Sequence, residues 1–125
     1  MTRILFVAGD PSGDEHAARV AGEAKARGAE IIAAGGPALK NVADHWLGDL
    51  VSQSVMGFLE PIKKIPFFIN FLNHVIRPAL VDLKPDVVVP TDFFGFNGFV
   101  AKAAKAAGRK VCYFVSPQVW ASRPG

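Results

Sequence analysis

The sequence predicts an α/β fold, in which a parallel sheet carries helices on both of its faces. Short runs of Ile, Val, Leu and Phe alternate along the chain with longer stretches of helical periodicity. Such alternation is typical of strand–helix–strand units, and continuous apolar runs are typical of strands buried on both faces. The chain has 125 residues and no repeat or linker-like tract, so we expect residues 1–125 to form a single domain.

The first half of the chain supplies three strands and two helices. The apolar run 3–8 is a strand, and a helix should follow over about 13–27, because its Ala and Val residues share one stripe and Gly28 ends it. Residues 31–34 form a second buried strand. The remaining elements are a short helix over 38–43, which Pro37 opens, and a weaker strand over 46–51.

The second half is more helical. Residues 55–83 have a helical pattern that Pro61 and Pro66 interrupt, and Pro78 should kink the long helix near its end. The elements that follow are a buried strand over 86–90, a helix over 97–107 and a last strand over 110–115.

Composition excludes several classes of protein. Only 20% of the residues are charged, which excludes a disordered chain. Cys112 is the single cysteine, so there is no disulfide framework, and the composition suits a reducing cytoplasm. The apolar neighbours of Cys112 indicate that its small side chain is buried. His16, His45 and His74 lack the paired spacing of metal ligands, so no metal site is expected.

Charge and hydropathy limit the partners. The formal net charge is +3, yet no basic run exceeds Lys63-Lys64, so nucleic-acid binding has little support. The apolar start over 4–8 is too short for a signal peptide, and no apolar stretch reaches the roughly 18 residues of a membrane span. We therefore expect a protein that stays inside the cell, with binding to a membrane surface left open.

Polar and glycine-rich turns follow the predicted strands at their carboxyl ends. Open α/β sheets bind ligands outside these ends. The turns are 9–14, 35–37, 91–97 and 116–120. They are the candidate site.

The first of these turns, Gly9 to Asp14, joins a strand to a helix. Its backbone N–H groups could receive a phosphate or a sugar hydroxyl. It lacks the Walker and dinucleotide-binding patterns, and the carboxylates of Asp10 and Asp14 would repel an anion placed between them. The alternative is structural, with Ser12 or Asp14 capping the helix.

Asp92 follows a buried strand and is a candidate general base for a substrate hydroxyl. Apolar surroundings would raise the pKa of this carboxyl, and the neighbouring phenylalanines 93, 94, 96 and 99 could supply them. The alternative is that Asp92 caps the next helix. Asn97, the next polar residue, suits a sugar or a loop backbone equally well.

A long apolar segment precedes this region, next to Lys63 and Lys64. It is apolar around much of its circumference, so it could lie on an anionic membrane or contact acyl chains. The alternative is ordinary core with a homodimer contact. The candidate lipid-contacting residues are Phe67, Phe68, Phe71, Leu72, Val75 and Ile76.

Six motifs together resemble the lipid-A-disaccharide synthase family, in that family's order and spacing. They are Gly9-Asp10-Pro11-Ser12-Gly13-Asp14, Gly35-Gly36-Pro37, Val55-Met56-Gly57 with Glu60, Leu83-Lys84-Pro85-Asp86, Asp92 with Phe96-Asn97, and Tyr113-Phe114-Val115-Ser116-Pro117-Gln118-Val119-Trp120-Ala121. The resemblance covers nearly all of this chain but only the N-terminal part of the family's length.

The resemblance implies the Rossmann-like, acceptor-side N-terminal domain of a two-domain GT-B glycosyltransferase, whose C-terminal nucleotide-binding domain is absent here. The family joins UDP-2,3-diacylglucosamine to 2,3-diacylglucosamine 1-phosphate, with inversion and without a metal or other cofactor. It works as a peripheral protein on the cytoplasmic face of the inner membrane. The chain by itself should be inactive.

The resemblance also assigns roles to residues. Asp92 falls on the family's essential aspartate, the candidate base that takes the proton of the attacking hydroxyl. The candidate substrate-binding residues are Gly9, Asp10, Ser12, Gly13, Asp14, Met56, Gly57, Glu60, Asn97, Ser116, Gln118 and Trp120.

Three positions depart from the family pattern. Asp10 stands where the family usually has Glu, Gly95 where it generally has a second Asp, and Ser122 where it has a second Trp. These departures keep a second hypothesis open, a non-catalytic module that binds an acylated sugar phosphate or a lipid. A flavodoxin-like or receiver-like domain is disfavoured, because the chain has neither a phosphate cradle nor a receiver's acidic cluster.

Overall fold

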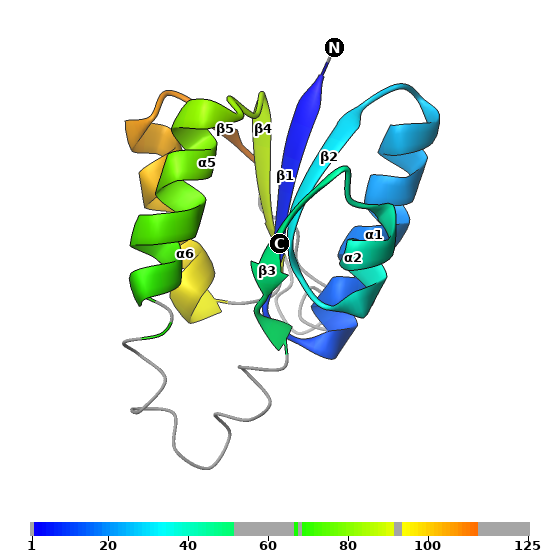
Figure 1. The fold of residues 1–125 in the computed structure, drawn as a ribbon, viewed down its shortest axis with the longest axis horizontal. Coiled ribbons are helices and arrows are strands. Elements are labelled where there is room, and N and C mark those ends of the chain that lie inside the picture. Colours follow the sequence, from blue (N-terminus) through cyan, green and yellow to red (C-terminus); the bar gives the residue numbers. More distant parts are fainter. Residues whose placement is uncertain (1, 52–66, 68, 92–93, 113–125) are drawn as a thin grey trace, which may run out of the picture.

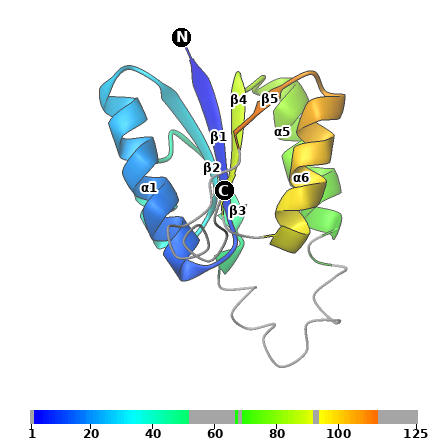
Figure 2. The ribbon, with the colours of Figure 1, turned by 180° about the vertical axis from the view of Figure 1, so that it is seen from behind.

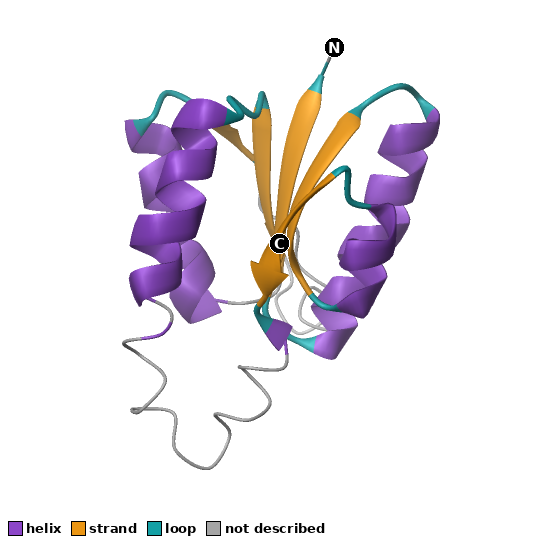
Figure 3. Cartoon of the chain, viewed as in Figure 1, coloured by secondary structure: helices purple, strands orange, loops and turns teal. Residues whose placement is uncertain are grey.

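The computed structural model describes residues 2–51, 67, 69–91 and 94–112, with residues 94–98 described by their backbone alone. Five parallel strands form one sheet in the order β3-β2-β1-β4-β5 (Figure 1). Helices flank the sheet on both sides (Figure 3). The predicted Rossmann-like α/β arrangement is confirmed.

The elements follow the predicted order. The strands are β1 (Arg3–Ala8), β2 (Glu30–Gly35), β3 (His45–Asp49), β4 (Val87–Thr91) and β5 (Lys110–Val111). The helices are α1 (Pro11–Ala26), α2 (Pro37–Val42), the π-helical turn η1 (Leu72–Ile76), α5 (Arg77–Asp82) and α6 (Phe94–Ala106).

Strand order reverses at the centre of the sheet. From β1 the chain passes to β2 and β3 on one side, then crosses over to β4 and β5 on the other. β1 therefore pairs with both β2 and β4, and Ala8 at the end of β1 lies opposite Thr91 at the end of β4. At such a reversal, the turns after the two central strands lead away from each other. Open α/β sheets bind ligands in the crevice between such turns.

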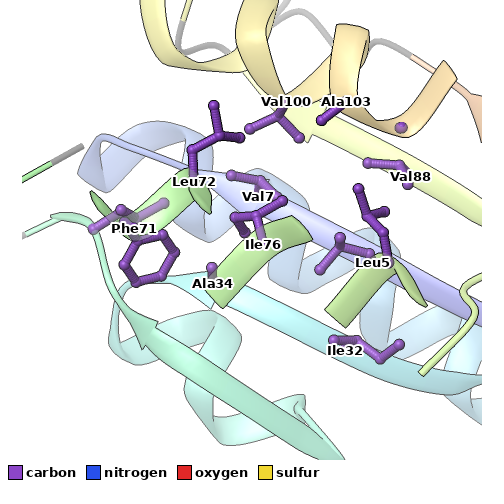
Figure 4. Packing of buried hydrophobic residues seen from close by; sticks show 13 residues of the cluster. Leu5, Val7, Ile32, Ala34, Phe71, Leu72, Ile76, Val88, Val100 and Ala103 are labelled. Carbon is purple, nitrogen blue, oxygen red and sulfur yellow. The ribbon is translucent and has the colours of Figure 1, made fainter. Parts of the chain in front are cut away.

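Two apolar cores lie on opposite faces of the sheet. Figures 1 and 2 show the helices that cover these faces, α1 and α2 on one and α5 and α6 on the other. Along β1, Leu5 and Val7 belong to the core under η1, α5 and α6, whereas Phe6 and Ala8 belong to the core under α1 and α2. This alternation explains why β1 reads as a continuous apolar run, since both faces of the strand are covered. Figure 4 shows the first core, with Leu72, Ile76 and Val100 beside Leu5, Val7 and Val88.

Pro78 lies in the first turn of α5, directly after the π-helical turn η1. Proline has no N–H to continue the helical hydrogen-bond ladder, and π turns are a common cause of helix irregularity. The structure shows a change of helix type just before Pro78, and the predicted kink at Pro78 stays a prediction.

Three of the candidate lipid-contacting residues are buried in the core. They are Phe71, Leu72 and Ile76, and Phe67 and Val75 pack partly buried against it. The sheet's large apolar face needs this cover, so these side chains satisfy the alternative of ordinary core.

Close packing at the sheet's edge explains the burial of Phe71. Leu47 is an extra residue in β3, where the register with β2 shifts between Ala33 and Ala34. At the bulge Gly48 has φ +154°, and a Cβ atom there would lie 2.8 Å from the Phe71 ring. Glycine thus lets the aromatic ring contact the backbone of the edge strand.

Cys112 is exposed, so the prediction of a buried thiol is wrong. Its backbone N–H donates to the Val88 carbonyl, which continues the pairing of β5 with β4. Within the described sheet β5 is an edge strand, and successive side chains of a strand point to opposite faces.

Ionic contacts join the starts of the strands, at the edge opposite the turns of the candidate site. The Arg3 guanidinium lies 3.0 Å from the Glu30 carboxylate, which also bonds to the His45 ring. The hydrogen bond from His45, and then that from Arg3, hold the pKa of Glu30 below its ordinary value. At Asp44 the hydrogen bond from the Ile31 N–H lowers the pKa most.

These contacts make stability depend on pH. Because the pKa of Glu30 is lowered by folding, its contribution is complete above its ordinary value of 4.5 and is lost as the pH falls through the folded value. Glu30→Gln should therefore reduce the free energy of unfolding more at about pH 7 than at about pH 3. Urea denaturation at both pH values checks this, with Glu23→Gln on α1 as the control. An equal loss at both would contradict it.

Candidate functional site

The candidate site lies at the carboxyl ends of β1 and β4, where the strand order reverses. Two turns start there from neighbouring strands, because Ala8 pairs with Thr91. Gly9 and Asp10 follow β1 directly. Asp92 comes next after Thr91 in the sequence but lies outside the described residues.

Asp10 caps α1, so the prediction that Ser12 or Asp14 does so is wrong. The Asp10 backbone is extended, its carboxylate accepts from the Gly13 N–H at 2.6 Å, and its carbonyl accepts from the Asp14 N–H at 2.9 Å. Pro11 then fills the first helical position, where a missing N–H is harmless. Ser12 is left exposed on the turn.

Asp14 has a different role, because its side chain turns away from its own helix. The carboxylate is only 2% exposed and accepts three backbone N–H groups at the start of α2. Oδ1 bonds to Gly36 at 2.9 Å and to Leu39 at 3.0 Å, and Oδ2 bonds to Ala38 at 2.9 Å. A buried N–H without a partner costs about 1–3 kcal/mol, so this carboxylate is a major support of the turn.

The two glycines of the 35–37 turn make room for that carboxylate. A Cβ on Gly36 would lie 2.7 Å from Asp14 Oδ2, and one on Gly35 would lie 2.6 Å from the Leu39 side chain and 3.3 Å from Asp14 Oδ1. The motifs Gly9–Asp14 and Gly35–Pro37 are therefore two sides of one contact. Sequence reasoning identified both motifs but had no signal that paired them.

Carboxylates lie at the helix starts of this edge. The Asp10 carboxylate accepts the Gly13 N–H of α1, and the Asp14 carboxylate accepts the Gly36, Ala38 and Leu39 N–H groups at the start of α2. Helix N-termini attract anions through free N–H groups and the helix dipole, and here both are offset by negative charge. These two turns favour neutral hydroxyl groups over phosphate.

The predicted apolar surroundings of Asp92 stay a prediction, because Asp92 lies outside the described residues. Among the four neighbouring phenylalanines, Phe99 is exposed on α6. The side chains of Phe94 and Phe96 are not among those described, and Phe93 lies outside the described residues. Thr91, which the sequence placed in the 91–97 turn, is the buried last residue of β4, beside the end of β1.

The other predicted site residues divide as follows. Gly9 and Gly13 are buried, and Asn97 lies near the start of α6, described by its backbone alone. Residues Phe68, Met56, Gly57, Glu60, Ser116, Gln118 and Trp120 lie outside the described residues, so their predicted roles stay predictions.

The described part of the chain contains no cluster of three or more His, Cys, Asp or Glu side chains that could hold a metal ion. A shallow hollow lined by Lys25, Gly28, Ala29, Glu30 and Asp44 lies at the opposite edge of the sheet, away from the turns of the candidate site. Among the described residues, no helix is both long and apolar enough to cross a membrane.

Comparison with known proteins decides the family. The family model described as lipid-A-disaccharide synthetase matches residues 4–125. The chain belongs to this family. The predicted resemblance is confirmed over nearly the whole chain, including the residues outside the described ranges.

Curated relatives agree with the family model. The chain is 39% identical over 125 residues to the lipid-A-disaccharide synthase of Myxococcus xanthus, which covers 98% of this chain. It is 37% identical over 123 residues to lipid-A-disaccharide synthase 1 of Legionella pneumophila and 36% identical over 124 residues to the Syntrophus aciditrophicus synthase. It spans about a third of each relative's length, 32% in all three.

The cap of α1 gives a direct test of this geometry. Asp10→Ala removes the acceptor of the Gly13 N–H and should lower the free energy of unfolding by about 1 kcal/mol. Ser12→Ala, on the same turn, should change it by less than about 0.5 kcal/mol. Chemical denaturation of both variants checks this. A larger loss of stability in Ser12→Ala than in Asp10→Ala would mean that Ser12, not Asp10, caps the helix.

Proposed function

We propose that the chain is the acceptor-side, N-terminal domain of a GT-B lipid-A-disaccharide synthase. The family match over residues 4–125 carries this proposal. The whole protein would join UDP-2,3-diacylglucosamine to 2,3-diacylglucosamine 1-phosphate, giving the lipid A disaccharide 1-phosphate and UDP. The nucleotide would be held by a C-terminal domain, beyond the third of the relatives' length that this chain spans.

The proposed chemistry is an inverting displacement. A hydroxyl oxygen of the acceptor attacks the anomeric carbon of the donor, the bond from that carbon to the phosphate oxygen breaks, and UDP leaves with the electron pair. Asp92 would take the hydroxyl proton as general base. Its place in the sequence, directly after Thr91 at the strand reversal, supports this role.

The charge at the neighbouring turns supports an acceptor-side assignment. Asp10 and Asp14 place carboxylates at the starts of α1 and α2, which disfavours a diphosphate and suits sugar hydroxyls. Nucleotide binding would then depend on the other domain. Substrate contact by Asp10, Ser12 and the residues of the later motifs is part of the proposal.

A transfer assay tests the proposal. In a full-length protein containing this chain, Asp92→Ala should reduce disaccharide formation by at least about 10³-fold without unfolding, since it removes the base. Asp82→Ala, an exposed carboxylate on α5, is the matched control. The isolated chain should form no product until a family C-terminal domain is added in trans, because the donor site is absent.

The outcomes separate two functions. Near-normal turnover of Asp92→Ala would remove Asp92 as the base. No product from the full-length wild type would favour a non-catalytic module that binds an acylated sugar phosphate or a lipid. Gly95, where the family generally has a second Asp, is the position that favours this second function. Gly95→Asp would then be the first variant to test for a return of transfer activity.

We also propose that the chain works at the cytoplasmic face of the inner membrane, where diacylated substrates reside. Ile69 is 52% exposed and Phe67 is half-buried, so an apolar surface remains on the helical segment although Phe71, Leu72 and Ile76 are core. A partly buried apolar side chain at a membrane surface strengthens binding. A homodimer contact at this surface is the alternative.

Vesicle binding distinguishes a membrane from a second copy of the chain at this surface. Ile69→Ser should weaken partitioning to phosphatidylethanolamine–phosphatidylglycerol vesicles by about tenfold, because burying one aliphatic side chain contributes about 1.5–3 kcal/mol. Val81→Ser, at an exposed aliphatic residue of α5, is the control. Unchanged partitioning of Ile69→Ser, with a loss of dimer by ultracentrifugation, would assign the surface to a second copy.

A further inference from the structure

We propose that Asp14 is a positioning residue, whose carboxylate fastens the turn after β1 to the turn after β2, and through that turn to the residues after β3, and thereby holds Asp10 and Ser12 in place at the carboxyl end of β1. The inference rests on the proposed function, because it concerns the acceptor side of the same site. It gives Asp14 a role distinct from substrate contact.

The first step is the contact between the first two turns. Asp14 belongs to the first turn of α1, where its N–H bonds to the Asp10 carbonyl at 2.9 Å. Its carboxylate takes the N–H groups of Gly36, Ala38 and Leu39. A displacement of the second turn therefore acts directly on the backbone that carries Asp10.

The second step extends this contact to the residues after β3. The Gly35 carbonyl accepts from the Leu50 N–H at 2.8 Å, and a Cβ on Gly36 would lie 2.9 Å from the Val51 side chain. Leu50 and Val51 are themselves buried. Hydrogen bonds and close packing thus run from α1 through the 35–37 turn to the residues that follow β3.

The third step is that Asp14 has no room for a second role. Its side chain is 2% exposed, and both of its oxygens accept backbone N–H groups. Asp10 and Ser12, by contrast, reach the surface of the same turn. Binding sites need such supporting contacts, because small displacements of a positioned group cost large factors in rate.

Asp14→Asn is the main variant, because an amide keeps the shape but presents a donor to one backbone N–H. In the full-length protein, the KM for the acceptor should rise by about 10- to 100-fold while the KM for the donor stays unchanged. Asp44→Asn is the matched control: Asp44 also accepts a backbone N–H, from Ile31 at 2.8 Å, but at the opposite edge of the sheet. It should leave both KM values within about twofold of the wild type. A purely structural loss would lower kcat and leave both KM values unchanged, which would overturn the proposal.

Hydrogen exchange tests the contact between the turns without any catalysis. In Asp14→Asn, the amides of Gly36, Ala38 and Leu39 should lose protection while those of β1 keep it. If these amides stay protected, the proposal is wrong, whether or not the protein is a transferase. If the wild type forms no disaccharide but the exchange result holds, the proposed function fails and the positioning contact stands.

Gly36→Ala provides a second route, since its methyl group would displace the carboxylate without removing it. Gly22→Ala in α1 is its control, because a Cβ there meets nothing within 4 Å. Gly36→Ala should reproduce the rise in the KM for the acceptor, and Gly22→Ala should not. If neither Asp14→Asn nor Gly36→Ala folds, the contact is a requirement of folding and the positioning role is rejected.

Discussion

Burial of β1 on both faces is the constraint on which the rest of the structure depends. Its side chains alternate between the two apolar cores, and its backbone pairs with β2 on one side and β4 on the other. Each helical layer therefore packs against the same central strand. Because the chain moves outward from β1 in both directions, the turns after β1 and β4 begin side by side, and this places the candidate site.

The acidic residues of the first turn show how one short motif can serve several purposes. Asp10 caps the start of its own helix, whereas Asp14 supports the start of the next helix, and the glycines there leave space for it. The resulting surface carries negative charge where nucleotide-binding turns offer free N–H groups. An acceptor-side domain that leaves the nucleotide to its partner domain is consistent with such a surface.

The apolar segment before α5 illustrates a limit of sequence patterns. A helix that is apolar around most of its circumference suggests a lipid surface, yet Phe71, Leu72 and Ile76 cover the sheet, and the Phe71 ring contacts the edge strand at Gly48. Helical periodicity shows how much apolar surface exists but not how much of it the sheet will cover. Ile69 is the large residue that stays exposed there among those described.

The sequence by itself determined the element order, the buried parallel strands and the family, because apolar periodicity, turn residues and spaced motifs are local properties of the chain. It also predicted the 9–14 and 35–37 turns, which the structure brings into contact. Only the tertiary structure decided the strand order, the exposure of Cys112 and the partner of Asp14. These depend on contacts between residues far apart in the chain: Asp14 and Gly36 are 22 positions apart, and only the folded sheet brings the carboxylate to that N–H.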